Sequence, residues 1–343
     1  MLNDDGYAYA KASWIIGKSF LGKRFNQLSG LHTLSELDRL VFPDSYRELP
    51  GRELLVDLER RIEQRAIRQI LSIVKSYTHP HKLLVRMIKG YEHSDLKKCF
   101  THISCGKYDV PALSDIGRFR NIRFDLYPDF PAMLKKTEYE NLLGEDIKHI
   151  KQGMDLTAIE TKLDFYYYQG LIEGLSQLFI EEDRHAAARL ITDEIRLRNC
   201  LWALRLRTYY NKSESEIKKY LLDFKLNRNI YQRSESLSAE AKTSLDFHLD
   251  LRKNWAGWRW EKFLNPSEGT LDWKVDPRHF QNAASQYLYH HVYHNFHSSP
   301  VSVSAIYCFI KLKQFEEDML TSIAEGLALG MDSSGVFKML EVA

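Results

Sequence analysis

Apolar residues recur at steps of three and four over long stretches of this chain, the spacing that places them on one face of an α-helix. The pattern is clearest from Arg52 to Tyr77, where charged residues occupy the opposite face. The apolar positions of this stretch are Leu55, Leu58, Ile62, Ala66, Ile70 and Val74. We therefore predict a long amphipathic helix here.

The same periodicity predicts further helices, and prolines mark several of their starts. Proline disfavours the helical conformation of the residue before it and is well suited to begin a helix. The predicted helices run from about Pro80 toward Ile103, from about Lys135, and over Ala158–Phe179, Glu182–Tyr210, Pro277–His297 and Val301–Leu329. No segment has the sustained alternation of apolar and polar residues that is typical of a half-buried strand. We therefore expect an all-α fold.

Two segments interrupt the helical pattern. The first runs from Gly106 to Pro131, where several prolines and glycines follow one another closely, and it predicts a connection between units. The second is a polar patch from Arg233 to Ala239, followed by a loop around Trp273 that contains Pro266, Gly269 and Pro277.

Three short stretches can be superposed, each on a predicted helix that follows another long helix. They are Tyr91–Lys97, Thr192–Arg198 and Phe315–Thr321. In each, an acidic residue precedes a leucine by four positions, and the acidic residues are Glu92, Asp193 and Glu316. Repeats of this kind indicate a repeated helical unit. We predict three units, with the bounds 1–125, 126–230 and 231–343.

Composition agrees with a helical protein. The chain has 17 Gly and 9 Pro in 343 residues, about 8% against a usual share of roughly 12%. Lys and Arg number 48 and Asp and Glu 46, a formal charge of +2, which leaves no global attraction to nucleic acid or anionic lipid. A length of 343 residues suggests two to three units at about 150 residues each.

The cysteines and the first residues of the chain suggest a cytoplasmic protein. The four cysteines are Cys99, Cys105, Cys200 and Cys308, and without a C-x-x-C pair we expect mostly buried, reduced thiols. The first residues are acidic, so we expect no secretory signal. The longest stretch without Asp, Glu, Lys or Arg, His279–Ile310, is too polar to cross a membrane.

Several short motifs occur in order between Tyr7 and Gly330. They are Tyr7-Ala8-Tyr9-Ala10-Lys11-Ala12, Lys18-Ser19 with Leu21, Glu92–Lys97, Ala158–Tyr167, Asp193–Arg198 with its continuation to Arg207, and Tyr307, Lys313, Glu316, Ile323 and Gly326. In order and spacing they resemble the C subunit of V-type and A-type ATP synthases, called subunit d in eukaryotic V-type ATPases. The third repeat departs from the family pattern at Gln314, Met319 and Thr321.

The resemblance implies an all-helical funnel of three related units around a pseudo-threefold axis. It implies a non-catalytic central-stalk subunit without cofactors, peripheral on the cytoplasmic face of the membrane. Its partners would be the rotor axle of the catalytic sector and the proteolipid ring, between which it would transmit torque. Whether protons or sodium ions are moved, and in which direction the machine runs, would be decided by other subunits.

The repeat positions are the candidate site residues. We expect one set to hold neighbouring helices in register: Glu92, Asp95, Asp193, Arg196 and Glu316. We expect a basic set to face the axle: Lys97, Arg198, Arg205 and Arg207.

Four histidines form the most enzyme-like feature. They are His290, His291, His294 and His297. Two histidines four positions apart on a helix can share a metal ion, but this segment contains no carboxylate and no H-E-x-x-H motif. We favour helix packing or an interface role, and simple exposure or metal binding remain alternatives.

The span from Arg184 to Arg233 is basic, with 12 Lys and Arg against 5 Asp and Glu. A nucleic-acid site would use such residues on phosphates. A solvated or internally paired face is the alternative, since Asp193 has the helical spacing to reach Arg189 and Arg196. An acidic protein surface is the third possibility.

Four tryptophans, Trp255, Trp258, Trp260 and Trp273, predict either core packing, which we favour, or an exposed interface. Gly326 and Gly330 follow a predicted helix, where glycine helps to end it. No motif of nucleophilic catalysis is present. A general helical scaffold and, more remotely, a histidine-dependent metalloenzyme are the rival functions.

Overall fold

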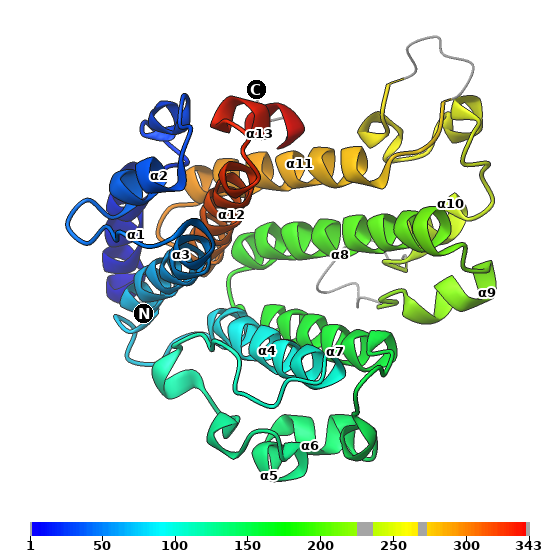
Figure 1. Cartoon of the computed structure of the whole chain (residues 1–343), viewed down its shortest axis with the longest axis horizontal. Helices are drawn as coiled ribbons and strands as arrows, with labels where there is room; N and C mark the ends of the chain where they lie inside the picture. Colours follow the sequence, from blue (N-terminus) through cyan, green and yellow to red (C-terminus); the bar gives the residue numbers. More distant parts are fainter. Residues whose placement is uncertain (1, 225–235, 267–272, 341–343) are drawn as a thin grey trace. The chain divides into compact units, whose positions relative to one another are not determined.

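The computed structural model describes residues 2–224, 236–266 and 273–340, and over these residues the protein is all-helical, without a β-strand (Figure 1). The all-α prediction is confirmed. The predicted boundary at residue 230, the start of the polar patch at Arg233 and the loop position Gly269 lie outside the described residues. The three-unit funnel stays a prediction.

The chain forms two compact units. Unit 1 comprises Met1–His102, Tyr108–Met133 and Val292–Ala343, and unit 2 comprises Ile103–Lys107 and Leu134–His291. The predicted connection from Gly106 to Pro131 therefore falls almost entirely within unit 1. The three repeat units, 1–125, 126–230 and 231–343, remain a prediction that this division leaves open.

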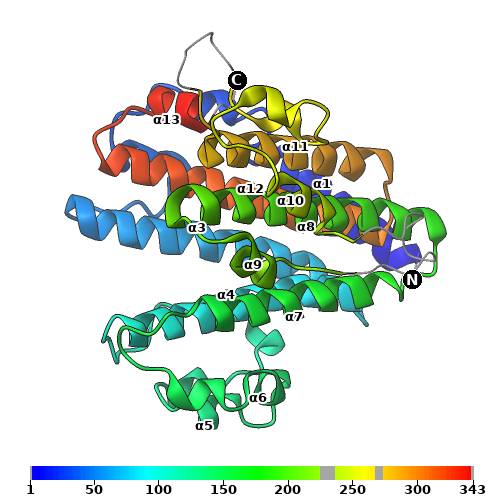
Figure 2. The same cartoon turned by 90° about the vertical axis from the view of Figure 1, so that its right-hand side faces the viewer.

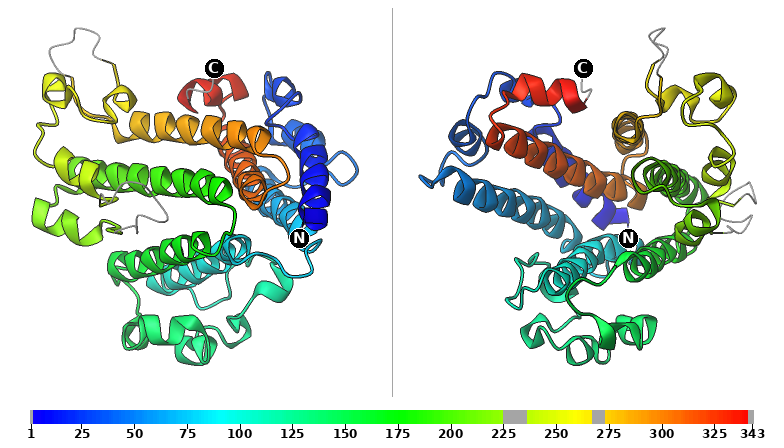
Figure 3. Two further views of the ribbon diagram at one scale, coloured as in Figure 1. Left: turned by 180° about the vertical axis from the view of Figure 1, so that it is seen from behind. Right: turned by 45° about the vertical axis from the view of Figure 1, so that its right-hand side comes forward.

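Unit 1 is built around two long helices, α3 and α12, which pack against each other (Figures 1 and 3). Its helices are α1 (Leu2–Gly17), α2 (Leu34–Val41), α3 (Gly51–Val74), α4 (Lys82–Ser104), α12 (Val303–Ala328) and α13 (Ser333–Leu340). Helices α1 and α2 pack on both α3 and α12. Residues far apart in the sequence therefore share one core.

The buried face of α3 follows the predicted spacing with one change at its start. Leu54 is buried and Leu55 only partly, so the stripe begins one position earlier than expected. Helices α1, α2 and α13 were not predicted. Helix α2 begins at a capping box, in which Thr33 and Glu36 satisfy each other's backbone N–H groups.

The segment between α4 and unit 2 consists of short turns. These are η2 (Gly117–Phe119), η3 (Phe124–Leu126) and α5 (Phe130–Leu134). The ring of Phe130 meets that of Phe100 on α4 at 4.9 Å between centroids. The prolines prevent a long helix here, and aromatic packing holds the segment against α4.

Unit 2 is built on α7 (Thr157–Leu175) and α8 (Glu181–Tyr210), which pack together (Figure 2). The smaller helices are α6 (Glu138–Leu143), α9 (Glu214–Ile217) and α10 (Ala239–Ser244), with turns η4 (Asp146–His149), η5 (Lys218–Tyr220), η6 (Arg252–Trp255) and η7 (Glu261–Phe263). Helix α11 (Pro277–Ser298) begins in unit 2. The long helices therefore match the predicted ranges to within a few residues.

The four tryptophans lie in the core of unit 2, which confirms the packing prediction. All four are buried, and Trp255 is completely so. The indole N–H groups of Trp255, Trp258 and Trp273 donate to the carbonyl oxygens of His248, Glu240 and Asn265. The polar ends of these three tryptophans are thus satisfied inside the fold.

The two C-terminal glycines differ from each other. Gly330 follows α12 with φ +82°, as expected for a residue that ends a helix. Gly326 instead lies inside α12, where an added Cβ would stand 2.2 Å from Cγ2 of Val336. The prediction that Gly326 ends the helix is wrong. The absence of a side chain at Gly326 instead lets α13 approach α12.

Cys99, Cys200 and Cys308 are buried free thiols, as predicted, whereas Cys105 is exposed. Within the described ranges, none of the helices combines the length and the apolar character needed to span a bilayer.

Candidate functional site

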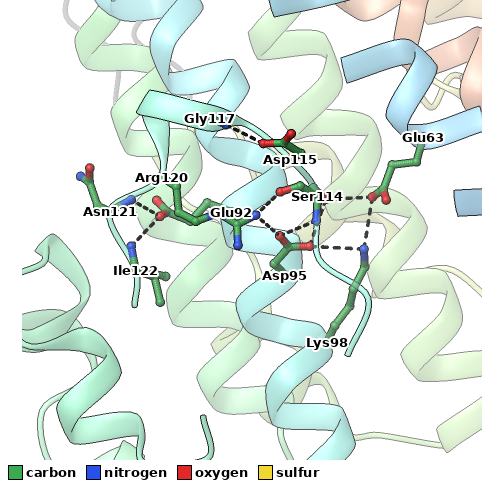
Figure 4. Close-up of polar contacts among 10 residues, drawn as sticks. All are labelled: Glu63, Glu92, Asp95, Lys98, Ser114, Asp115, Gly117, Arg120, Asn121 and Ile122. Atoms are coloured by element: carbon green, nitrogen blue, oxygen red, sulfur yellow. Dashed lines mark hydrogen bonds and ion pairs between the residues drawn. The ribbon is translucent and has the colours of Figure 1, made fainter. Parts of the chain in front are cut away.

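The first repeat forms a buried polar cluster between α4 and the segment that follows it (Figure 4). Glu92 is completely buried, and its carboxylate accepts hydrogen bonds from the backbone N–H groups of Asn121 and Ile122, the latter at 2.8 Å. A carboxylate can be buried when such donors replace water. Glu92 thereby holds the irregular segment 114–122 against α4.

Asp95, one helical turn further along α4, has four donors around it. Ser114 donates through its backbone N–H at 2.9 Å and its hydroxyl at 3.0 Å. Lys98 and Arg120 lie at 3.4 and 3.3 Å. Burial raises the pKa of Asp95 to about 6, although these donors and charges act in the opposite direction.

Glu63 joins this cluster to α3. Its carboxylate accepts from Nζ of Lys98 at 3.2 Å, and it lies 3.0 Å from the hydroxyl of Ser114, whose single proton is shared between Glu63 and Asp95. Helices α3 and α4 and the segment containing Ser114 are therefore connected through shared polar groups (Figure 4).

The second repeat forms an equivalent cluster in unit 2. Asp193 accepts from Arg259 at 3.0 Å and from the hydroxyl of Tyr287 at 2.9 Å. Arg196, whose side chain is buried, donates to Glu240 at 3.1 Å. Arg259 also reaches Glu240, at 2.9 Å. These bonds connect α8 with α10, α11 and the segment before η7.

An internally paired face was one alternative for the basic span, because Asp193 has the helical spacing to reach Arg189 and Arg196. The bonds described above run across the fold instead. Burial and the charge of Asp193 raise the pKa of Tyr287 to about 12, so Tyr287 remains a hydrogen-bond donor at neutral pH.

The third repeat connects α12 to the segment after α1. Glu316 is buried and accepts from the backbone N–H of Phe20 at 2.8 Å. It also pairs with Lys313 on its own helix, and Nη2 of Arg65 on α3 lies 3.7 Å away. The departures from the family pattern at Gln314, Met319 and Thr321 therefore leave Glu316 with polar partners.

The three superposed acids, Glu92, Asp193 and Glu316, share one structural property. Each is buried, and each accepts hydrogen bonds from a segment far away in the sequence. The leucines four positions later are Leu96, Leu197 and Leu320, and all three are buried. That these contacts set the register of neighbouring helices stays a prediction.

The residue after the motif acid also accepts a hydrogen bond in two of the repeats. Glu194 accepts from the hydroxyl of Tyr168 at 3.0 Å, and Glu317 from that of Tyr91 at 3.1 Å. Burial and the nearby charges of Asp318 and Glu63 raise the pKa of Glu317 to about 8.

Several residues of these clusters were missed in the sequence. They are Glu63, Ser114, Glu240, Arg259 and Tyr287. They lie outside the repeated motifs and in segments of different structure, so no shared spacing marks them.

The basic residues expected to face an axle have contacts within the chain. Arg198 pairs with Asp164 on α7, and Arg205 donates to Gln281 on α11. Arg207 donates to the carbonyl oxygens of Ser244 and Phe247 at 2.7 and 2.8 Å, and so caps the end of α10. Lys97 is partly buried on α4. Their orientation toward a partner stays a prediction.

The four histidines lie along α11. His290, His294 and His297 are exposed, whereas His291 is partly buried and packs on Tyr287 at 4.2 Å between ring centroids. Over residues 2–224, 236–266 and 273–340, no three His, Cys, Asp or Glu side chains are grouped so that they could hold a metal ion. The described geometry thus gives the metalloenzyme alternative no support.

Taken together, the two units and their clusters define a helical protein in which buried charged residues connect distant segments. The model of the ATP synthase (C/AC39) subunit family matches residues 19–336, and the chain belongs to this family. The family consists of non-catalytic subunits, and membership implies a central-stalk subunit of a V/A-type ATPase. An uncharacterized protein of Treponema pallidum (strain Nichols) is 26% identical over 329 residues, which cover 95% of this chain and 93% of that protein.

Proposed function

We propose that this chain joins the rotor axle of a V/A-type ATPase to the proteolipid ring of the membrane sector and transmits torque between them. The family match over residues 19–336 carries this proposal. In this proposal the chain is a funnel of three related units on the cytoplasmic face of the membrane. It needs no cofactor and catalyses no reaction. The transported ion and the direction of rotation belong to other subunits.

The buried clusters are well suited to this role. A subunit that transmits torque must resist deformation, and close-packed interiors transmit strain. In each repeat, hydrogen bonds to a buried carboxylate add a connection between distant segments. Breaking such a contact leaves an uncompensated buried charge, at a cost of about 3–5 kcal/mol. The clusters therefore favour a single rigid arrangement within each unit.

In this proposal the basic residues Lys97, Arg198, Arg205 and Arg207 face carboxylates of the axle. Arg198 is exposed while it contacts Asp164, and the partly buried Arg205 contacts Gln281. A double-mutant cycle that pairs Arg205→Ala with removal of each axle carboxylate tests the contact. A coupling energy near zero for every pair would remove Arg205 from the interface.

The test of the function is purification of the tagged chain from its own cells in mild detergent, followed by native mass spectrometry. The expected complex contains axle subunits and the proteolipid. A cell line that expresses the tag alone provides the control. Recovery of the chain without either partner would favour the rival, a helical scaffold unrelated to the ATPase.

A further inference from the structure

The turn between α7 and α8 exposes two large apolar side chains. Phe179 is 87% exposed and Ile180 is 57% exposed. The residues on either side are ordered by hydrogen bonds: Leu178 is buried, and its carbonyl oxygen accepts from Nη1 of Arg184 at 3.1 Å. The backbone N–H of Arg184 donates to the carbonyl oxygen of Ile180 at 3.0 Å. The exposed pair therefore belongs to a well-defined turn.

Three exposed carboxylates lie close to this pair in the sequence. Glu181 and Glu182 begin α8 and are exposed, and Glu173 near the end of α7 is exposed as well. The positive end of the helix dipole accounts for acidic residues in the first turn of α8. It does not account for an exposed phenylalanine and isoleucine, because apolar side chains of this size gain free energy when they leave water. Adjacent exposed apolar side chains mark a candidate contact surface, and aromatic residues such as Phe are enriched at protein interfaces.

The charge around the pair selects between two kinds of partner. An anionic lipid surface repels Glu173, Glu181 and Glu182, and so it disfavours this turn. Cytoplasmic loops of membrane proteins are enriched in Lys and Arg. Loops of that kind at the ends of apolar helices offer both an apolar contact and a complementary charge. In charge and apolar character, the turn therefore fits the basic loops of a membrane protein better than the anionic lipid around them.

The position of the turn agrees with this choice. Helix α8 runs from Glu181 to Tyr210, about 45 Å at 1.5 Å per residue. Arg205, which we propose to face the axle, lies near its other end. One straight helix thus has an acidic, apolar surface at its start and a basic surface toward its end. A subunit between two partners needs two such separated surfaces.

We infer that Phe179 and Ile180 insert between the cytoplasmic loops of the proteolipid ring, with Glu181 and Glu182 facing basic residues of those loops. The inference rests on the proposed function, and it names the segment that contacts the ring. Glu181 lies 3.8 Å from Nε2 of His185, an exposed contact that a loop cation can replace.

The first test measures binding of the full chain to nanodiscs that contain the purified proteolipid ring. Empty nanodiscs with the same phosphatidylserine content are measured in parallel. Phe179→Ala and Ile180→Ala are each expected to weaken binding to the ring at least about tenfold, or about 1.4 kcal/mol. Leu329→Ala, which changes an exposed leucine elsewhere, is the matched control and should leave binding unchanged. Equal binding to empty nanodiscs, or unchanged binding of both variants, overturns the inference.

The second test places a photo-crosslinking amino acid at position 179 in the assembled complex. An adduct with the proteolipid supports the inference. An adduct only with another subunit, or no adduct in a complex that contains the ring, overturns it while leaving the proposed function standing. Loss of co-purification of the unmodified chain with the ring and the axle would instead contradict the proposed function.

Discussion

Burial of a carboxylate requires donors that replace its water, and the three motif acids obtain these donors in different ways. Glu92 accepts from backbone N–H groups, Asp193 from side chains, and Glu316 from both. An acidic residue thus occupies each repeated position while its partners change. The property that the three positions share is burial of an acid and not one particular bond.

Removing the acceptor at Glu92 tests its structural role. In Glu92→Ala the buried N–H of Ile122 and that of Asn121 lose their acceptor, and such losses cost about 1–3 kcal/mol per group. We expect the free energy of unfolding to fall by about 2–5 kcal/mol in urea titrations followed by circular dichroism. Glu92→Gln retains a carbonyl oxygen and should lose less.

Ser94→Ala changes an exposed residue on the same helix and is the control. If Glu92→Ala is as stable as Ser94→Ala to within about 0.5 kcal/mol, the carboxylate does not hold the segment.

Glu317 should make stability depend on pH. Its pKa in the folded protein is about 8, against an ordinary value of 4.5. Between these values the folded state keeps a proton that the unfolded state has lost, so stability decreases as the pH rises from about 4.5 to about 8. The slope is at most about 1.4 kcal/mol per pH unit. Glu63, Asp318 and Lys98 contribute to the charge around this group, and Tyr91 donates a hydrogen bond to it.

Glu317→Gln removes this titration. The variant should gain stability relative to the wild type as the pH rises, and the difference should level off above about pH 8. Thermal unfolding at a series of pH values measures it, with the exposed Glu48→Gln as control. A constant difference across the range contradicts the assignment.

At the scale of elements, close approach of α13 to α12 depends on a glycine. Gly326 lies inside α12, where glycine costs about 1 kcal/mol relative to alanine. That cost is offset by packing, because Val336 of α13 occupies the space in which a side chain would lie. The hydroxyl and backbone of Ser333 also bond Leu31, which anchors the start of α13.

Gly326→Ala should therefore destabilise unit 1 by about 1–3 kcal/mol through overpacking. The double variant Gly326→Ala/Val336→Ala should recover part of this loss, since the clash is then removed, and a double-mutant cycle of unfolding free energies measures the recovery. Gly17→Ala, where an added Cβ has no neighbour within 4 Å, is the control and should be neutral or slightly stabilising. Additive effects of the two changes would contradict the proposed contact.

At the scale of the whole molecule, the proposed role as a torque link predicts uncoupling. Membrane vesicles from cells without this chain should retain ATP hydrolysis by the catalytic sector and lose ATP-driven ion accumulation. The two activities are measured on the same vesicles, and expression of the wild-type chain should restore coupling. Retained ion accumulation without the chain would refute the torque role.

Much of the fold could be predicted because a long helix shows the spacing of its apolar residues directly in the sequence. The stretch Arg52 to Tyr77 predicted α3 (Gly51–Val74) from apolar spacing alone. Helix α1 was missed, although Ala8, Ala12, Ile15 and Ile16 form its buried face, because small side chains give a weak apolar pattern. Short α2 and α13 were missed because isolated helices of their length are unstable and depend on packing.

The candidate site could be predicted only in part. The repeats identified Glu92, Asp193 and Glu316 as a set, and the structure buries all three. Their partners could not be predicted: helical spacing allowed Asp193 to pair with Arg189 and Arg196 within α8, whereas it bonds Arg259 and Tyr287. Local spacing describes neighbours along one helix, and it carries no information on which other segment reaches the same place.

The sequence by itself determined that the protein is helical, where the long helices run and which acids occupy equivalent repeat positions. It did so because helix formation and burial of one face depend on residues a few positions apart. Only the tertiary structure decided what each buried charge contacts, that Gly326 serves packing and not helix termination, and that the tryptophans are core. Those outcomes depend on which distant segments meet, and on the cost of leaving a buried polar group without a partner.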